Sequence, residues 1–189
     1  AVAALHAVAE LWLGAKKAEA AAAALEKARE LEPGSRETAD RLRSLYAQAG
    51  NWRDYARVSD LLLGSLTGED ERLELLEELA EVHEKRLGQK EMAFLAWCRA
   101  FHLRPADAKA GAAVERLAAE TEAFEELCDV YEQVAEESRG ATRARLLLRM
   151  GRLRDQRLDV AAGVEAALRR ALETDPANAE AYWSLANLK

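Results

Sequence analysis

The sequence repeats one short helical pattern three times, and a proline follows each copy. The three segments are "ALEKARELEPGSR" (24–36), "AWCRAFHLRPADA" (96–108) and "ALRRALETDPANA" (167–179). Their prolines, Pro33, Pro105 and Pro176, recur at almost equal intervals. Each segment places a small, a large and a small residue at helical spacing. A neighbouring helix can then approach closely, and the proline ends the helix. A pattern that returns at a fixed interval predicts a repeat architecture.

A weaker copy of the pattern lies halfway between the prolines. The segments "LYAQAGNWRDYARVSDLL" (45–62) and "LAAETEAFEELCDVYEQV" (117–134) align in the register that superimposes Pro33 on Pro105. Trp52 then corresponds to Phe124, Tyr55 to Leu127 and Leu62 to Val134. The interval between prolines is therefore a double unit, expected to consist of two helix pairs of about 36 residues each.

The composition predicts an all-α fold. Half of the residues are hydrophobic, so the chain can bury a substantial core. Alanine, leucine, glutamate and arginine dominate, and all four favour helices. Helix pairs are expected at 2–31, 35–66, 70–103, 106–137 and 141–173, followed by a helix at 177–188. Connections of two to four residues force consecutive helices to be antiparallel neighbours.

Helix starts are predicted where a short polar side chain precedes an apolar run. Such a side-chain oxygen can accept hydrogen bonds from the first free amides of a helix. The predicted N-caps are Ser35, Asn51, Thr121, Asp159 and Asp175.

The last segment, "DPANAEAYWSLANLK", resembles the start of a tetratricopeptide repeat (TPR). Tyr182, Trp183, Leu185 and Ala186 stand where that family has its aromatic and Leu-Gly positions. The equivalent pairs elsewhere are Met150–Gly151 and Leu79–Ala80, and Ala93, Trp97, Ala100 and Pro105 match the second helix. Arg43 and Glu115 stand where the family has a small residue, and helix 70–87 is one residue longer than the usual repeat of that family allows.

The resemblance covers essentially the whole chain and implies a right-handed α-solenoid of antiparallel helix pairs. Residues 1–189 are expected to form a single array. Tyr182 and Trp183 would normally be covered by a following helix, so the chain is expected to be a fragment of a longer array.

The resemblance also implies that the first helix of each pair lines a concave, partner-binding face. In helix 70–87, Leu76, Leu79, Ala80 and His83 form the expected packing stripe. In helix 141–157, Leu147, Met150, Gly151 and Arg154 do so. The expected groove residues are Glu74, Glu77, Glu81 and Glu84 on the first of these helices; Arg145, Leu148, Arg149, Arg152 and Asp155 on the second; and Trp183 and Asn187 on the last helix.

The expected groove changes sign along the chain. Residues 69–84 hold eight acidic residues and one arginine, whereas residues 139–157 hold seven arginines and one aspartate. One interpretation is that these charges solvate helix surfaces and pair with neighbouring helices. The other is that a bipolar groove orients a bound peptide, with arginines holding acidic groups bidentately.

The sequence offers no catalytic or metal-binding pattern. His83 lies outside the zinc-protease spacing and is expected in the core, as is the aromatic stripe Phe94, Trp97 and Phe101. Cys98 and His102 share a helix face, but no second pair completes a metal site. Cys98 and Cys128 are expected to be buried free thiols. No cofactor is predicted, because glycine-rich phosphate loops and nucleophile motifs are absent from the sequence.

These observations predict a non-catalytic scaffold that binds a protein or peptide on its concave, charge-segregated face. The net charge of −7 disfavours nucleic acid as a partner, and no apolar run approaches the length of a membrane span. A cytoplasmic location is expected. The alternatives are a regulatory or sensor arm of a larger enzyme or regulator, and a structural element that forms homo-oligomers by end-to-end stacking of its terminal helices.

Overall fold

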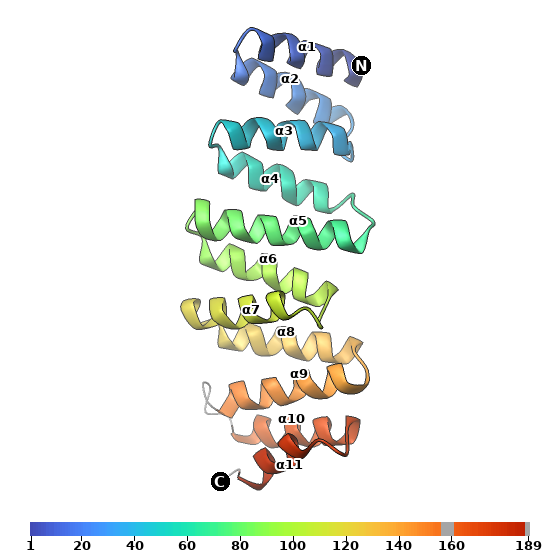
Figure 1. The fold of residues 1–189 in the computed structure, drawn as a ribbon, viewed down its shortest axis with the longest axis vertical. Helices are drawn as coiled ribbons and strands as arrows, with labels where there is room; N and C mark the ends of the chain where they lie inside the picture. The colour runs from blue at the N-terminus through green and yellow to red at the C-terminus, as the bar shows by residue number, and fades with distance from the viewer. Residues whose placement is uncertain (156–160, 188–189) are drawn as a thin grey trace. The chain divides into compact units, whose positions relative to one another are not determined.

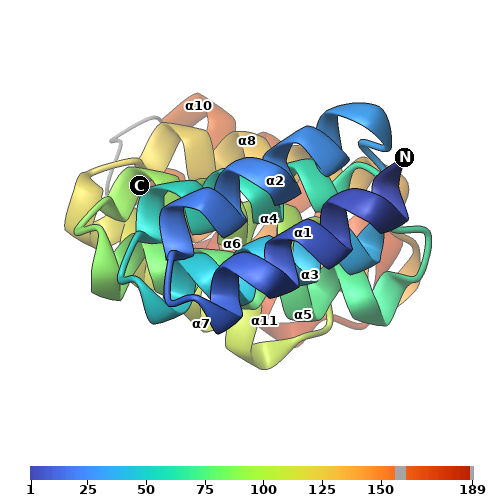
Figure 2. The same ribbon diagram turned by 90° about the horizontal axis from the view of Figure 1, so that it is seen from above.

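The computed structural model describes residues 1–155 and 161–187. Within those ranges the chain forms α-helices, π-helical segments and short connections, and contains no strand (Figures 1 and 2). The predicted all-α class is therefore confirmed. The chain divides into two compact units, Ala1–Ala96 and Trp97–Lys189.

Unit 1 is a stack of helix pairs. Its helices are α1 (Val2–Gly14), α2 (Ala18–Leu31), α3 (Arg36–Gln48), α4 (Trp52–Leu63), α5 (Glu69–Glu81), the π-helix η1 (Val82–Arg86) and the start of α6 (Lys90–Leu103). From α1 to α5 each helix packs on the next one. The short connections make consecutive helices antiparallel, as predicted from the sequence.

Unit 2 is built in the same way. It contains the end of α6 and then α7 (Ala108–Thr121), α8 (Phe124–Glu137), α9 (Gly140–Leu153), α10 (Ala161–Thr174) and α11 (Ala179–Ala186). From α7 to α11 each helix again packs on its neighbour. We call α1, α3, α5, α7, α9 and α11 first helices, and the helix after each is its second helix.

The recurring small–large–small pattern forms the packed side of the second helices. Ala24, Leu25 and Ala28 are buried in α2, and the corresponding residues of α6 and α10 are buried as well. Phe94, Trp97 and Phe101 are each less than 5 % exposed, so the aromatic stripe of α6 belongs to the core, as predicted. The packing stripes of α5 and α9 are also buried, except that Arg154 is part-exposed.

Two of the five predicted N-caps are confirmed. The side chains of Ser35 and Asn51 accept from the amides of Thr38 and Asp54, both at 3.4 Å. The prediction for Thr121 was wrong: it is the last residue of α7, and its hydroxyl donates to the carbonyl of Leu117 instead.

The prediction for Asp175 was also wrong, because Asn178 caps α11 in its place. Asp159 lies outside the described residues. One cap was missed: Asp107, before α7, accepts from the amides of Lys109 and Ala110.

The residue excess noted in helix 70–87 is accommodated by a π-helix. The segment Val82–Arg86 leaves α-helical geometry, and the amide of Leu87 donates to the carbonyl of Val82, an i+5 hydrogen bond. A single π turn adds one residue to a helix without changing the face that the following residues present. Arg154 and Asp155 also adopt π-helical geometry. With Ala80 aligned on Gly151, the two helices therefore depart from the α-helix within one residue of each other.

Several predicted helix ends were misplaced by two or three residues. The pair predicted at 35–66 ends at Leu63, because Gly64 begins the connection to α5, and the pair predicted at 106–137 begins at Ala108, after the Asp107 cap. The helix predicted at 177–188 begins at Ala179, after the Asn178 cap, and its last predicted residue lies outside the described range.

Replacing Glu122 with glycine is expected to stabilise unit 2. Glu122 is exposed and caps α7 in the left-handed region, with φ of 58°. A side chain is strained there and glycine is not, so Glu122→Gly should raise the free energy of unfolding by about 0.5–1 kcal/mol. Glu120→Gly, two residues earlier and inside the helix, should lower it by about 1 kcal/mol. Urea unfolding measures both changes, and a loss of stability in Glu122→Gly would contradict the expectation.

Candidate functional site

Among the crevices that the described residues line, three open on the face formed by the first helices. Each lies between two consecutive first helices and is floored by the second helix that joins them. Two crevices belong to unit 1 and one to unit 2. The crevices form at this position because consecutive first helices are separated by the width of a second helix, and the side chains between them do not fill that space.

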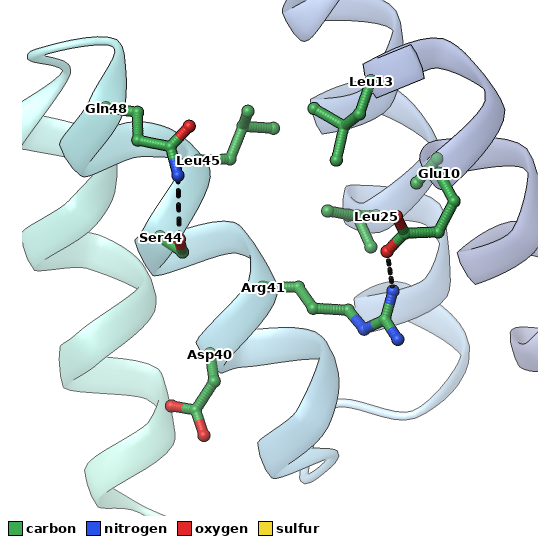
Figure 3. Close-up of a pocket in the computed structure, with 9 residues that line it drawn as sticks. Glu10, Leu13, Leu25, Asp40, Arg41, Ser44, Leu45 and Gln48 are labelled. Atoms are coloured by element: carbon green, nitrogen blue, oxygen red, sulfur yellow. Dashed lines mark hydrogen bonds and ion pairs between the residues drawn. The ribbon is translucent and has the colours of Figure 1, made fainter.

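The larger crevice of unit 1, called the unit 1 crevice, lies between α1 and α3 over α2 and holds about 360 Å³. Its lining is Ala9, Glu10, Leu13, Leu25, Asp40, Arg41, Ser44, Leu45 and Gln48, most of which Figure 3 labels. Leucines form its apolar wall and floor. The rim is polar: Arg41 bonds Glu10 at 2.5 Å, and Gln48 donates to Ser44 at 3.2 Å (Figure 3).

The unit 2 crevice lies between α7 and α9 over α8 and holds about 380 Å³. Its lining is Glu115, Ala119, Phe124, Leu127, Tyr131, Arg149, Arg152 and Leu153. Two arginines and Glu115 therefore stand on the rim of a hollow whose remaining lining is apolar or aromatic. Arg149 is 38 % exposed and Arg152 45 %, so both guanidinium groups meet solvent as well as the crevice.

The acidic stripe predicted on α5 lies at the surface of unit 1. Glu74 is exposed and also lines the smaller crevice between α3 and α5. Glu77, Glu81 and Glu84 are part-exposed, and the carboxylate of Glu81 forms an ion pair with the ammonium of Lys85, 2.9 Å away. The four carboxylates thus remain candidates for contact with a partner.

The basic stripe predicted on α9 needs one correction. Leu148 is 4 % exposed and packs in the core of unit 2, so it offers no surface to a partner. Arg145 and Asp155 are exposed. Arg145 donates to the carbonyl of Pro105 at 2.9 Å, and Arg152 forms an ion pair with Glu180 of α11.

A charge network ties α3, α4 and α5 together in unit 1. The guanidinium of Arg43 donates to Ser59 at 3.1 Å and to the Tyr55 hydroxyl at 2.8 Å, and it pairs with the Glu78 carboxylate. The Tyr55 hydroxyl donates to the same carboxylate. Burial and this bond raise the pKa of Tyr55 to about 12, so the hydroxyl stays a donor at neutral pH.

Unit 2 contains the same network with the charges exchanged. The Tyr131 hydroxyl of α8 donates to Glu115 of α7 at 2.7 Å, and Arg149 of α9 lies 3.2 Å from the same carboxylate. Burial and the bond to Glu115 raise the pKa of Tyr131.

The repeat alignment makes the two networks equivalent. Glu115 corresponds to Arg43 when Pro33 is aligned with Pro105, and Arg149 corresponds to Glu78 when Pro105 is aligned with Pro176. At this position the sign reversal noted in the sequence is therefore compensated within each unit. The same alignment explains how a large charged side chain fits where the family has a small one, because Arg43 and Glu115 each bond the tyrosine of the following helix.

The residues predicted on the last helix are exposed. Trp183 is 71 % exposed, and Tyr182 beside it is 55 % exposed. Asn187 donates its side-chain amide to the carbonyl of Trp183 at 2.7 Å, so it closes the end of its own helix.

The described residues contain no cluster of three or more His, Cys, Asp or Glu side chains placed to hold a metal ion. The imidazole of His102 lies 2.9 Å from the carboxylate of Glu137, and Cys98 is a buried free thiol. Burial raises the pKa of the Cys98 thiol to about 12, so that thiol stays protonated and unreactive near neutral pH. His83 is buried and bonds Gln89 at 2.9 Å, in agreement with the predicted core position.

The groove residues predicted from the sequence do not include those that line the unit 1 crevice. Asp40 and Ser44 of α3 correspond to Glu77 and Glu81 of α5 when Arg43 is aligned with Ala80, so extending the acidic stripe to α3 would have found these two residues. Gln48 lies one position beyond the equivalent of Glu84. The crevice itself depends on which side chains leave space between two helices, and spacing alone does not contain that information.

No family model and no curated protein matches the sequence. Similar solved structures include MamA, which is 17 % identical over 95 % of this chain and 94 % of that chain, with a TM-score of 0.45. YrrB, a TPR protein with an unusual peptide-binding site, is 20 % identical over 93 % of this chain and 87 % of that chain, with a TM-score of 0.41. A TPR protein of Thermus thermophilus is 15 % identical over 100 % of this chain and 98 % of that chain, with a TM-score of 0.41.

The helical-repeat fold that the resemblance predicted is confirmed by the described residues themselves, which form stacked antiparallel helix pairs in each unit. Across residues 1–155 and 161–187, no helix combines the length and apolar character that crossing a membrane requires.

Proposed function

We propose that this chain is a non-catalytic scaffold that binds a protein or peptide partner on the face formed by its first helices. The observation that carries the proposal is the recurrence of one kind of crevice in both units. Each large crevice has an apolar floor and a charged rim, and each has a volume typical of ligand pockets. A hollow of this kind accepts one or two apolar side chains and leaves the rim to select their neighbours.

The rim charges favour different peptides in the two units. In unit 2, Arg149 and Arg152 flank the crevice and Arg145 lies on the same stripe, so acidic residues beside an apolar anchor are favoured. In unit 1, the carboxylates of Glu74, Glu77, Glu81 and Glu84 form the acidic surface of α5, which favours basic residues; of these four, Glu74 lines the smaller crevice between α3 and α5. Each preference is proposed for its unit alone.

The proposal is tested with two capped octapeptides, each carrying two central leucines flanked by three glutamates or by three lysines on each side. We expect the acidic peptide to shift the amide NMR signals of Ala119 and of residues 149–153. Arg152→Ala should weaken its binding by about tenfold, because a charge-assisted contact is lost. Added salt should weaken binding as well.

Arg169→Ala is the matched control. Arg169 is 65 % exposed on α10, is paired with Glu165, and does not line the crevice. Its substitution should leave the affinity for the acidic peptide unchanged. Equal binding of the acidic and basic peptides at the unit 2 crevice, or no shift at all at millimolar peptide, would refute the proposed preference.

A further inference from the structure

The unit 2 crevice lies at positions whose equivalents in unit 1 carry larger side chains. The repeat alignment gives every residue that lines this crevice an equivalent on α3, α4 or α5. Three of these equivalents are larger in unit 1: Trp52 replaces Phe124, Tyr55 replaces Leu127, and Arg43 replaces Glu115. The side chains of unit 1 therefore indicate what the space in unit 2 can hold.

In unit 1 the ring of Tyr55 is enclosed by its neighbours. Tyr55 is 5 % exposed. The ring of Trp52 meets it edge-on, with the two ring centres 5.7 Å apart, and the guanidinium of Arg43 lies 5.2 Å from the centre of the Tyr55 ring. An aromatic edge and a cation are both favourable neighbours for an aromatic ring. This part of unit 1 is thus an aromatic site that the chain fills with its own side chain.

In unit 2 the smaller residues leave a hollow of about 380 Å³ at the same positions. Tyr131, which replaces Ser59, adds a ring to this unit, but the ring is held in the core. It is 1 % exposed and packs edge-on against Phe101 of α6, with the ring centres 5.8 Å apart. Tyr131 therefore forms part of the crevice wall and does not fill the crevice.

The crevice keeps the kinds of neighbour that the Tyr55 ring has in unit 1. Phe124 is half-buried in the crevice lining and supplies an aromatic side chain. Because the charges are exchanged between the units, the cation comes from α9, where Arg149 and Arg152 stand on the rim. A guanidinium binds a carboxylate in its plane and stacks on a ring with its face. The ion pairs of these arginines with Glu115 and Glu180 are therefore compatible with stacking.

We infer that the anchor of the unit 2 crevice is an aromatic side chain, such as a phenylalanine in an acidic segment of a partner. This inference rests on the proposed function and specifies the residue that the crevice selects. The bound ring takes the place of the Tyr55 ring of unit 1, beside Phe124 and over Leu127. The face of Arg149 or Arg152 stacks on it, and the acidic neighbours of the phenylalanine pair with the same two arginines.

The test compares three capped octapeptides that differ only at the first of the two central residues between the glutamates. That residue is leucine, as in the experiment above, phenylalanine, or cyclohexylalanine, whose ring is saturated. The phenylalanine peptide should bind at least about threefold more tightly than either of the others, because only an aromatic ring gains from an aromatic edge and a stacked guanidinium. The amide NMR signals of Ala119 and of residues 149–153 report the three affinities.

Filling the crevice with a side chain of the protein tests the location. Ala119 is exposed on α7 and lines the crevice, so Ala119→Phe places a ring in the hollow. It should weaken binding of the phenylalanine peptide by at least about tenfold. Ala166→Phe is the matched control, because Ala166 is exposed on α10 and does not line the crevice. Thermal unfolding should show both variants folded, since neither position is buried.

The possible outcomes separate this inference from the proposed function. Equal affinity of the three peptides would overturn the aromatic preference and leave the proposed function standing, because an apolar anchor would still bind. Absence of any shift with all three peptides at millimolar concentration would remove both. Unchanged binding of the phenylalanine peptide to Ala119→Phe would place the ring outside the crevice and would also overturn the inference.

Discussion

Reversing the charge of Arg43 is expected to destabilise unit 1 by about 3 kcal/mol, and reversing Glu78 as well is expected to recover most of that loss. The side chain of Arg43 is only 16 % exposed. In Arg43→Glu, a carboxylate would face Glu78 and lose the contacts with Ser59 and Glu78. Breaking a largely buried pair and leaving one charge without its partner costs about 3–5 kcal/mol, and the 49 % exposure of Glu78 reduces this toward the lower value.

The rescue follows from unit 2, where the exchanged arrangement already exists. In the double variant Arg43→Glu, Glu78→Arg, the glutamate can accept from the Tyr55 hydroxyl, as Glu115 accepts from Tyr131, and can pair with the arginine on α5, as Glu115 pairs with Arg149. Asp40 lies 3.1 Å from Arg43 and would repel the new glutamate. We therefore expect recovery to within about 1 kcal/mol of the parent rather than full recovery.

A double-mutant cycle measured by urea unfolding tests both statements. Lys85→Glu serves as the control, because the Lys85–Glu81 pair is 64 % and 45 % exposed and should contribute less than about 0.5 kcal/mol. If the two reversals at Arg43 and Glu78 simply add, the network does not act as a unit. The exchange of charges between the unit 1 and unit 2 networks would then contribute nothing to the free energy of unfolding.

These two networks show which part of the site could be predicted from the sequence and which could not. Aligning the repeats identified Arg43 and Glu115 as departures from the family pattern. The change of sign between residues 69–84 and 139–157 included Glu78 and Arg149. Each pair of positions was visible separately. What joined them was a tyrosine on the intervening helix, and it comes from different turns in the two units: Tyr55 in α4 and Tyr131 in α8. A one-dimensional repeat alignment does not register a partner that has moved by one turn.

Packing positions were easier to predict than surface positions, for a physical reason. A buried stripe is fixed by periodicity, so Leu76, Leu79, Ala80 and His83 could be assigned from spacing alone. Whether a side chain at the edge of such a stripe is buried depends on the neighbouring helix. Leu148 was predicted to face a partner and is buried. Leu11 is a large aliphatic residue of α1 and is 75 % exposed, whereas its equivalents Leu45 and Leu117 are buried in α3 and α7.

Deleting Lys85 is expected to leave unit 1 folded, whereas deleting Glu77 is expected to unfold it. The segments from Ala80 to Pro105 and from Gly151 to Pro176 are equal in length, and each is one residue longer than the segment from Ala9 to Pro33. The two longer repeats are those with π-helical geometry, at Val82–Arg86 and at Arg154 and Asp155. The extra residue is therefore held in the π turn, and removing it should convert i+5 hydrogen bonds into i+4 bonds with both flanking faces kept.

A deletion inside α5 cannot be absorbed in this way, because α5 contains no π turn. Losing Glu77 rotates one side of the helix by about 100° relative to the other. Either Leu73, Leu75 and Leu76 or Leu79, Ala80 and Val82 must then leave the core, and each large aliphatic residue lost costs about 2–5 kcal/mol. Circular dichroism and thermal unfolding should show a cooperative transition for the Lys85 deletion, lowered only by the loss of its exposed ion pair with Glu81. An equal loss of stability in the two deletion variants would mean that the π turn is itself required for packing. It would contradict the expectation that the π turn only accommodates the extra residue of this repeat.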